Sequence, residues 1–208
     1  MKLSLCHPSR GRPLKAVMTA EKWITEAGVP VEHIFSLDES DRYHKAYKTI
    51  DKLLVNPNDC VVQATNHAAK ASTGDVLLYL SDDVDCYKNW GQDLERICSL
   101  YSGEYLIKVN DGLQPFKNDV LTFPIMSRPL YEKLGYFFHP SYSSMWVDVD
   151  LYHVCERLGV LKFHSEIKYQ HNHYCNGKAV KDDTYIRSDR HFETGRQIHK
   201  QRQRQGYP

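Results

Sequence analysis

The chain has 208 residues, of which 41% are hydrophobic and 25% charged, and its formal net charge is +1 at pH 7. This length suits one domain, or one domain with a small appendage, and the composition is ordinary for a folded globular protein. A net charge so close to zero excludes a global field that would drive the whole chain onto nucleic acid or membrane.

The first part of the chain alternates between strand and helix patterns. We expect strands over residues 2–6, 33–37, 60–64 and 75–80, and helices over residues 14–27, 41–54 and 66–72. Strands separated by helices of these lengths build right-handed crossovers and a parallel sheet. Ligands bind to such sheets beyond the carboxyl ends of the strands.

Three carboxylates, Asp82, Asp83 and Asp85, follow the strand predicted over residues 75–80. Like charges this close repel one another unless a cation lies among them, and Mg²⁺ or Mn²⁺ prefers oxygen ligands. The alternative is an acidic turn that caps a helix beginning near Tyr87. We favour a metal site, because Asp38 and the loop at residues 9–12 also follow strands and therefore lie at the same edge of the sheet.

The second half is less regular. We expect strands over residues 104–109, 121–125 and 161–170, helices over 128–134 and 148–158, and an aromatic loop over 136–145. Asp150 is interpreted as a helix-dipole partner or cap. Asp148 lies at the start of the helix expected over 148–158, beside Trp146 and the aromatic loop. A partly desolvated carboxylate in this position could act as a general base.

His171 and His173 follow the last predicted strand. Residues at positions i and i+2 of a strand face the same side, and imidazole suits Mn²⁺ or Zn²⁺. The alternative is a pair of surface histidines.

The C-terminal segment, from Asp182 onward, is predicted to be helical and basic. Residues 187–208 contain six Lys or Arg and two Asp or Glu, an excess of four (6 − 2). A solvated, partly frayed tail explains this composition, as does a phosphate clamp that includes Arg187, or a contact with a nucleic-acid acceptor.

The six cysteines are scattered, without a Cys-x-x-Cys pair, and no signal peptide or membrane-length apolar run is present in the sequence. We therefore expect a protein without a membrane span in a reducing cytoplasm, which would be the host cytoplasm if a phage encodes it.

In their order along the chain, these motifs resemble those of the nucleotide-sugar-dependent glycosyltransferases of the GT-A fold, closest to the family-2-like inverting enzymes, in a compact form of bacterial or phage type. The resemblance covers roughly residues 2–175. It rests on the loop at 9–13, Asp38, the segment 66–75, the acids at 82–85, and the segments 134–137 and 146–151.

The resemblance implies an α/β fold, with a single GT-A (Rossmann-like) domain whose mostly parallel central sheet is flanked by helices. Residues 1–85 would form the nucleotide-binding half and residues 86–175 the acceptor half. Residues 176–208 would form a basic C-terminal extension.

The resemblance also implies roles for single residues. Asp148 would be the catalytic base, although Val147 stands where the family usually has a glutamate. Mn²⁺ or Mg²⁺ would be bound by Asp83, Asp85, His171 and His173. Two registers are open for the metal motif, Asp82-Asp83 and Asp83-x-Asp85, and both include Asp83. The donor would be bound by Pro8, Ser9, Arg10, Arg12, Asp38, Asn66, Asp82 and Arg187.

The implied function is inverting, metal-dependent transfer of a sugar from a nucleoside-diphosphate sugar, with UDP-sugars favoured. The acceptor hydroxyl would belong to a glycan or to a hydroxylated nucleobase in DNA or RNA. Two alternatives remain open: a metal-dependent nuclease or nucleotidyltransferase, and a non-catalytic nucleotide-binding module, which the departure at Val147 keeps open.

Overall fold

The computed structural model describes residues 1–47, 52–113 and 115–207. Its strands are β1 (Leu3–Ser9), β2 (Val31–Asp38), β3 (Lys52–Asn56), β4 (Val76–Tyr79), β5 (Val84–Asp85), β6 (Leu106–Asn110), β7 (Ile125–Ser127), β8 (Leu161–Lys168) and β9 (Gln170–His171). Its α-helices are α1 (Pro13–Thr25), α2 (Val61–Ala71), α3 (Trp90–Cys98), α4 (Arg128–Leu134), α5 (Val147–Arg157), α6 (Asp183–Asp189) and α7 (Phe192–Gln205). Short 3₁₀ helices are η1 (His44–Ala46) and η2 (Tyr174–Asn176).

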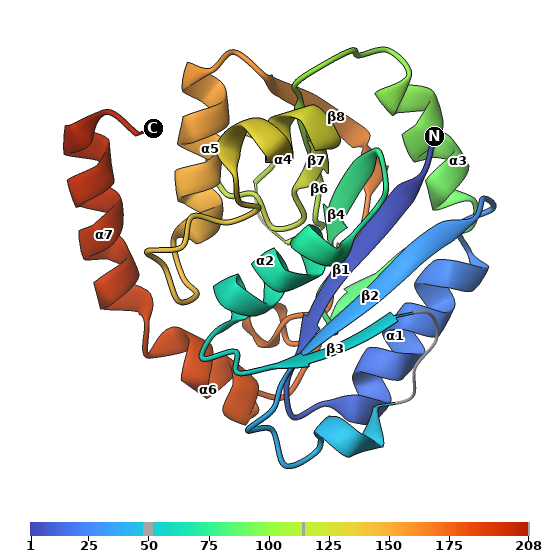
Figure 1. Cartoon of the computed structure of the whole chain (residues 1–208), viewed down its shortest axis with the longest axis vertical. Coiled ribbons are helices and arrows are strands. Elements are labelled where there is room, and N and C mark those ends of the chain that lie inside the picture. Colours follow the sequence, from blue (N-terminus) through green and yellow to red (C-terminus); the bar gives the residue numbers. More distant parts are fainter. Residues whose placement is uncertain (48–51, 114, 208) are drawn as a thin grey trace.

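A seven-stranded sheet in the order β3-β2-β1-β4-β7-β6-β8 forms the centre of the fold (Figure 1). Its strands pair in parallel except β7, which is antiparallel to both β4 and β6. The short strands β5 and β9 form a second, antiparallel pair. Because β1, β2 and β4 are parallel, their carboxyl ends meet at one edge, where a ligand site is expected.

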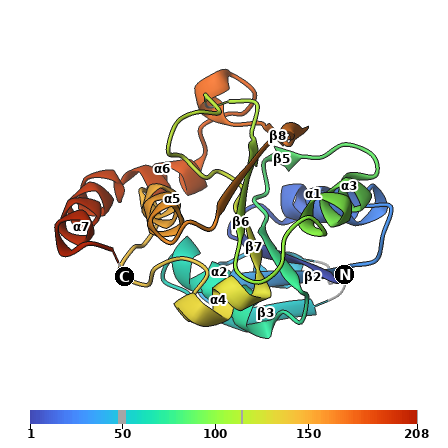
Figure 2. The ribbon, with the colours of Figure 1, turned by 90° about the horizontal axis from the view of Figure 1, so that it is seen from above.

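Helices cover both faces of the sheet (Figure 2). On one face, Trp23 of α1 and Trp90 of α3 pack with ring centroids 4.8 Å apart, and Tyr169 lies 4.7 Å from Trp23. On the other face, α2, α4 and α5 bury a separate apolar cluster that includes Leu130 and Leu151. The central strands β1 and β4 are buried on nearly every residue, and β2 is buried over most of its length, whereas the edge strands β3 and β8 are partly exposed.

The last helix, α7, packs beside α5 (Figure 1). Its Arg202 is 8% exposed and donates from Nε to Oδ1 of Asp150 at 2.8 Å. Tyr142 donates its hydroxyl to the same oxygen at 2.9 Å. Of the alternatives for this segment, a frayed tail does not describe α7, which is helical to Gln205, and its buried Arg202 carries the charge that compensates a carboxylate buried in α5.

Most of the predicted elements are confirmed. The strands expected over 2–6, 33–37, 75–80, 104–109 and 161–170 are present as β1, β2, β4, β6 and β8. The helices expected over 14–27, 128–134 and 148–158 are α1, α4 and α5, the helix expected over 66–72 is the second half of α2, and the helical segment expected from Asp182 onward contains α6 and α7. Local chemistry explains α4 well: the Ser127 side chain accepts from the N–H of Leu130 at its start, and Gly135 ends it at φ 75°.

Three predicted elements are wrong. The helix expected over 41–54 is η1 followed by the strand β3, with residues 48–51 outside the described part. The strand expected over 60–64 belongs to α2, whose buried residues Val62, Thr65, Ala68 and Ala69 follow helical spacing. The adjacent β-branched residues Val61 and Val62 favour a strand locally, but the buried positions along the whole segment recur with the period of a helix. The strand expected over 121–125 lies further along the chain, as β7 (Ile125–Ser127), and shares only residue 125 with the expected range.

In the described part of the chain, no helix combines the length and the apolar character that crossing a membrane requires.

We predict that Arg202→Leu lowers the free energy of unfolding by about 3–5 kcal/mol, because it leaves the carboxylate of Asp150 buried without its cation. Arg204→Leu, on the exposed side of the same helix, is the matched control and should change stability by less than about 0.5 kcal/mol. Urea unfolding of both variants measures the difference. Equal losses would show that the buried ion pair contributes no more than a surface charge.

Candidate functional site

A cavity of about 320 Å³ lies at the carboxyl ends of β1, β2 and β4. Its wall is completed by the start of α5, by β9 and by α6. Most of the residues predicted from the sequence line it: Pro8, Ser9, Arg10, Arg12, Asp38, Asp82, Asp83, Asp148, His171, His173 and Arg187. The structure thus brings together residues from both halves of the chain and from the C-terminal extension.

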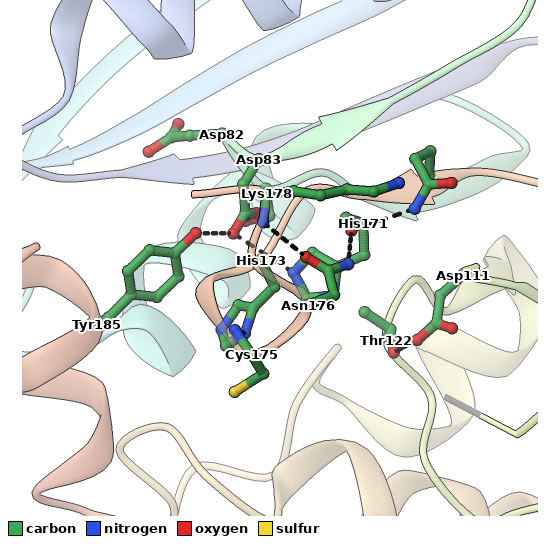
Figure 3. Close-up of polar contacts among 12 residues, drawn as sticks. Asp82, Asp83, Asp111, Thr122, His171, His173, Cys175, Asn176, Lys178 and Tyr185 are labelled. Atoms are coloured by element: carbon green, nitrogen blue, oxygen red, sulfur yellow. Dashed lines mark hydrogen bonds and ion pairs between the residues drawn. The ribbon is translucent and has the colours of Figure 1, made fainter. Parts of the chain in front are cut away.

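Asp83 is a carboxylate of the cavity that Tyr185 and His171 contact from the C-terminal part of the chain (Figure 3). Its Oδ2 accepts from the hydroxyl of Tyr185 at 2.5 Å and lies 3.4 Å from Nε2 of His171, while its Oδ1 accepts from Ser81 at 2.5 Å. Burial alone would raise the pKa of Asp83, but the hydrogen bonds from His171, Ser81 and Tyr185 outweigh it and hold the pKa well below its usual range. Asp83 is therefore ionised at any physiological pH.

Asp83, His171 and His173 form a cluster with the chemistry of a metal site. One potential ligand atom from each lies within 4.8 Å of the other two. Metal binding requires neutral imidazole, and burial, aided by the nearby His171, lowers the pKa of His173. The buried Nδ1 of His171 has no hydrogen-bond partner among the described residues. One carboxylate and two imidazoles fit Mn²⁺ better than Mg²⁺, which prefers oxygen ligands alone.

Asp82 has a different set of partners. It is 5% exposed, and its two oxygens lie 2.9 Å from Nε2 of His7 and 3.0 Å from Oγ of Ser9. Its carboxylate points away from the Asp83 cluster (Figure 3). Asp82 thus holds the end of β1 in place beneath the cavity.

Two predicted residues lie outside the cavity wall. Asp85 forms an ion pair with Lys22 of α1 on the outer side of the acidic turn. Asn66 bonds the backbone of Phe137 and Phe138 through Oδ1, at 3.0 and 2.9 Å, and thereby fixes the aromatic loop. Of the three carboxylates of the acidic turn, only Asp83 belongs to the candidate metal cluster found among the described residues.

The basic residues after β1 are held by carboxylates. Arg10 forms an ion pair with Asp38. Arg12 donates to both oxygens of Asp182 at 2.7 and 2.6 Å, and its guanidinium lies 4.2 Å from the ring centroid of Tyr185. Bidentate geometry of this kind also suits a phosphate group.

The segment containing α6 crosses the cavity from one side to the other. Thr184 donates to the carbonyl of Arg10 at 3.0 Å, and Arg187 donates to the carbonyl of Asp59 at 2.8 Å. Asp182, Thr184 and Tyr185 are site residues that the sequence did not predict. The only local signal is that Asp182 is a good helix N-cap, and its Oδ1 does accept from the N–H groups of Thr184 and Tyr185.

Asp148 lies in the opposite wall, in the first turn of α5. Burial raises its pKa to about 6, opposed in part by the backbone N–H groups of Val149 and of Asp148 itself. Asp119 raises the pKa further and Lys108 lowers it. The two carboxylates of the cavity thus differ: Asp83 is permanently charged, and Asp148 can take up and release a proton near neutral pH.

Comparison with solved structures gives the fold. The chain is similar to TarS from S. aureus: for residues 1–349 of TarS, the TM-score is 0.58 at 16% sequence identity, covering 82% of this chain and 60% of that one. Similar values hold for the complexes of TarS with UDP (0.57, 16%) and with UDP-GlcNAc (0.58, 14%). This chain therefore spans about 60% of the length of TarS 1–349. No protein-family model and no curated protein matches it.

The predicted fold class is confirmed. The mostly parallel seven-stranded sheet with flanking helices matches a single GT-A domain.

We predict that Asp148 makes stability depend on pH. Its folded-state pKa is raised from 3.8 to about 6, so between these values the folded protein retains a proton that the unfolded chain has lost, and the free energy of unfolding falls as pH rises through this window. Asp148→Asn should lack this decline. Glu132→Gln, which removes an exposed carboxylate of α4, should retain it. Chemical unfolding across the window measures this, and parallel curves for wild type and Asp148→Asn would contradict the raised pKa.

Proposed function

We propose that this protein is a metal-dependent glycosyltransferase that moves a sugar from a UDP-sugar to an acceptor hydroxyl, with inversion at the anomeric carbon. The observation that carries the proposal is the pair of unlike carboxylates in one cavity: ionised Asp83 clustered with His171 and His173, and Asp148, with its raised pKa, in the opposite wall. The GT-A fold and the UDP and UDP-GlcNAc complexes of TarS support a nucleotide-sugar donor.

The donor is assigned to the side of the cavity formed by the ends of β1, β2 and β4. Arg10 and Arg12 offer guanidinium groups to the diphosphate, and Asp38 offers a carboxylate to the N–H or hydroxyl groups of the nucleoside. Mn²⁺, or less favourably Mg²⁺, bound by Asp83, His171 and His173 would neutralise the negative charge that develops on the departing diphosphate.

The acceptor is assigned to the side of the cavity formed by Asp148, Met145 and Thr122. Asp148 accepts the proton of the acceptor hydroxyl while the acceptor oxygen forms a bond to the anomeric carbon. The bond from that carbon to the diphosphate oxygen breaks on the opposite face, and its electron pair leaves with UDP. One displacement inverts the configuration, and it requires a base, not a nucleophile, at Asp148.

A glycan hydroxyl is the acceptor that we favour. The basic tail suggested a nucleic acid, but Arg202 is buried against Asp150 and Arg196 pairs with Glu193. The charge that these arginines carry is compensated within the protein, which weakens the argument for a polyanionic partner.

We predict that Asp83→Asn abolishes the stabilisation of the protein by UDP in the presence of Mn²⁺, because the variant lacks the anionic ligand. For wild type, UDP at about 100 times its dissociation constant should stabilise by about 2.7 kcal/mol. Asp85→Asn is the matched control and should behave as wild type, since Asp85 pairs with Lys22 outside the cavity. Thermal-shift titrations with and without Mn²⁺ distinguish them. If Asp85→Asn lost UDP binding and Asp83→Asn kept it, Asp85 and not Asp83 would be the metal ligand.

We predict that Asp148→Asn lowers transfer, or slow donor hydrolysis, by roughly 10²–10⁴-fold while donor binding is unchanged, because a positioned base is lost. In wild type, the rate should rise with pH through about 6, since the carboxylate must be unprotonated. The variant should lack this rise. A parallel loss of donor affinity and rate would place Asp148 in the donor site, and an unchanged rate would remove it from the chemistry.

A further inference from the structure

The turn that leads into α5 has an unusual backbone. Trp146, the N-cap residue, has φ 75° and ψ −8°. Residues other than glycine seldom adopt this left-handed conformation, and bulky ones least of all. The first hydrogen bond of the helix starts from this residue, with the N–H of Asp150 donating to the carbonyl of Trp146 at 2.9 Å. Asp148 lies between these two residues, so the turn at Trp146 sets its direction.

Gly195 of α7 lies against this turn. A Cβ atom at Gly195 would overlap the carbonyl oxygen of Met145, and would lie 3.1 Å from the carbonyl carbon of Met145 and 3.2 Å from Cδ1 of Trp146. The obstructing atoms are mainly backbone, which cannot move aside as a flexible side chain can. Gly195 is buried, and its own helical backbone does not require glycine. Glycine is required at this position because α7 approaches the turn so closely.

Other groups of α7 hold the same turn on either side of Gly195. The indole ring of Trp146 lies between Phe192 and His199, with ring centroids 5.6 and 5.4 Å away. About two turns after Gly195, Arg202 binds Asp150 of α5. The contacts therefore cover the chain both before and after Asp148.

We propose that α7 is the positioning element for Asp148, with Gly195 as its key residue: the close contact of Gly195 with Met145 and Trp146 holds the strained turn that aims the Asp148 carboxyl into the cavity. Gly195 is a positioning residue and touches no substrate. The inference rests on the proposed function for its consequence on rate, but the placement of the Asp148 carboxyl can be measured without any reaction.

The surroundings of Asp148 make its position measurable. The titratable and charged groups that face it are Tyr79 of β4, Lys108 of β6 and Asp119 of the following loop. Displacement of the turn would change the distance of the carboxyl from these groups and its exposure to water. The midpoint of its titration would then move from about 6 toward its usual lower value.

The test compares Gly195→Ala with Thr194→Ala, its exposed neighbour on the same helix. Alanine has the highest helix propensity, so propensity alone would make α7 more stable in both variants. We expect Gly195→Ala to lower the Asp148 titration midpoint, measured by carboxyl NMR, and to lower the transfer rate on the order of 10²-fold, while the Mn²⁺-dependent thermal shift with UDP is unchanged. Thr194→Ala should match wild type in all three measurements.

A folded Gly195→Ala protein with the wild-type midpoint and rate would overturn the proposal. If Gly195→Ala does not fold, Phe192→Ala is the second test, because Phe192 is 47% exposed and its removal takes away the ring contact with Trp146. The Asp148 midpoint should then shift in the same direction, and an unchanged midpoint would overturn the proposal. If wild type transfers no sugar at all, the proposed function fails, whereas the NMR titration still decides whether α7 positions Asp148.

Discussion

The buried negative charge of Asp83 is the constraint on which the rest of the site depends. A carboxylate that is 3% exposed is costly unless donors surround it. Asp83 follows β4, and besides the neighbouring Ser81 its partners come from β9 and from α6. The hydrogen bond from Tyr185 joins residues 102 positions apart. The contacts that satisfy this charge tie β9 and α6 to the carboxyl ends of the strands, where both elements contribute to the cavity wall.

The two sides of the cavity illustrate how environment separates the roles of like residues. Asp83 is stabilised as an anion by hydrogen bonds, whereas Asp148 is destabilised as an anion by burial. Because the first holds its charge at every relevant pH and the second gains and loses a proton near neutrality, one suits a cation and the other suits proton transfer. A chemistry that needs both, such as sugar transfer from a diphosphate, fits the pair better than simple nucleotide binding does.

The C-terminal segment belongs to this machinery. Its α6 contributes Thr184 and Tyr185 to the cavity wall, and Asp182, the N-cap of α6, binds Arg12. Its α7 buries Arg202 against Asp150 and brings Gly195 against the turn before Asp148. The segment is basic in composition, but some of its charged side chains form ion pairs within the protein, as Arg202 does with Asp150. Composition counts charges without their partners, which is why it favoured a solvated tail.

Local sequence patterns were enough to predict the parallel α/β sheet, most of the element types and the edge at which the site lies. Strand and helix periodicity and the polar residues after each strand are properties that short segments carry. It also pointed to Asp83, His171, His173 and Asp148 as candidates. The tertiary structure alone decided that Asp82 bonds His7 beneath the cavity, that Asp85 faces Lys22, and that Tyr185 reaches Asp83. The directions of neighbouring carboxylates depend on partners far away in the chain, and no local pattern encodes those partners.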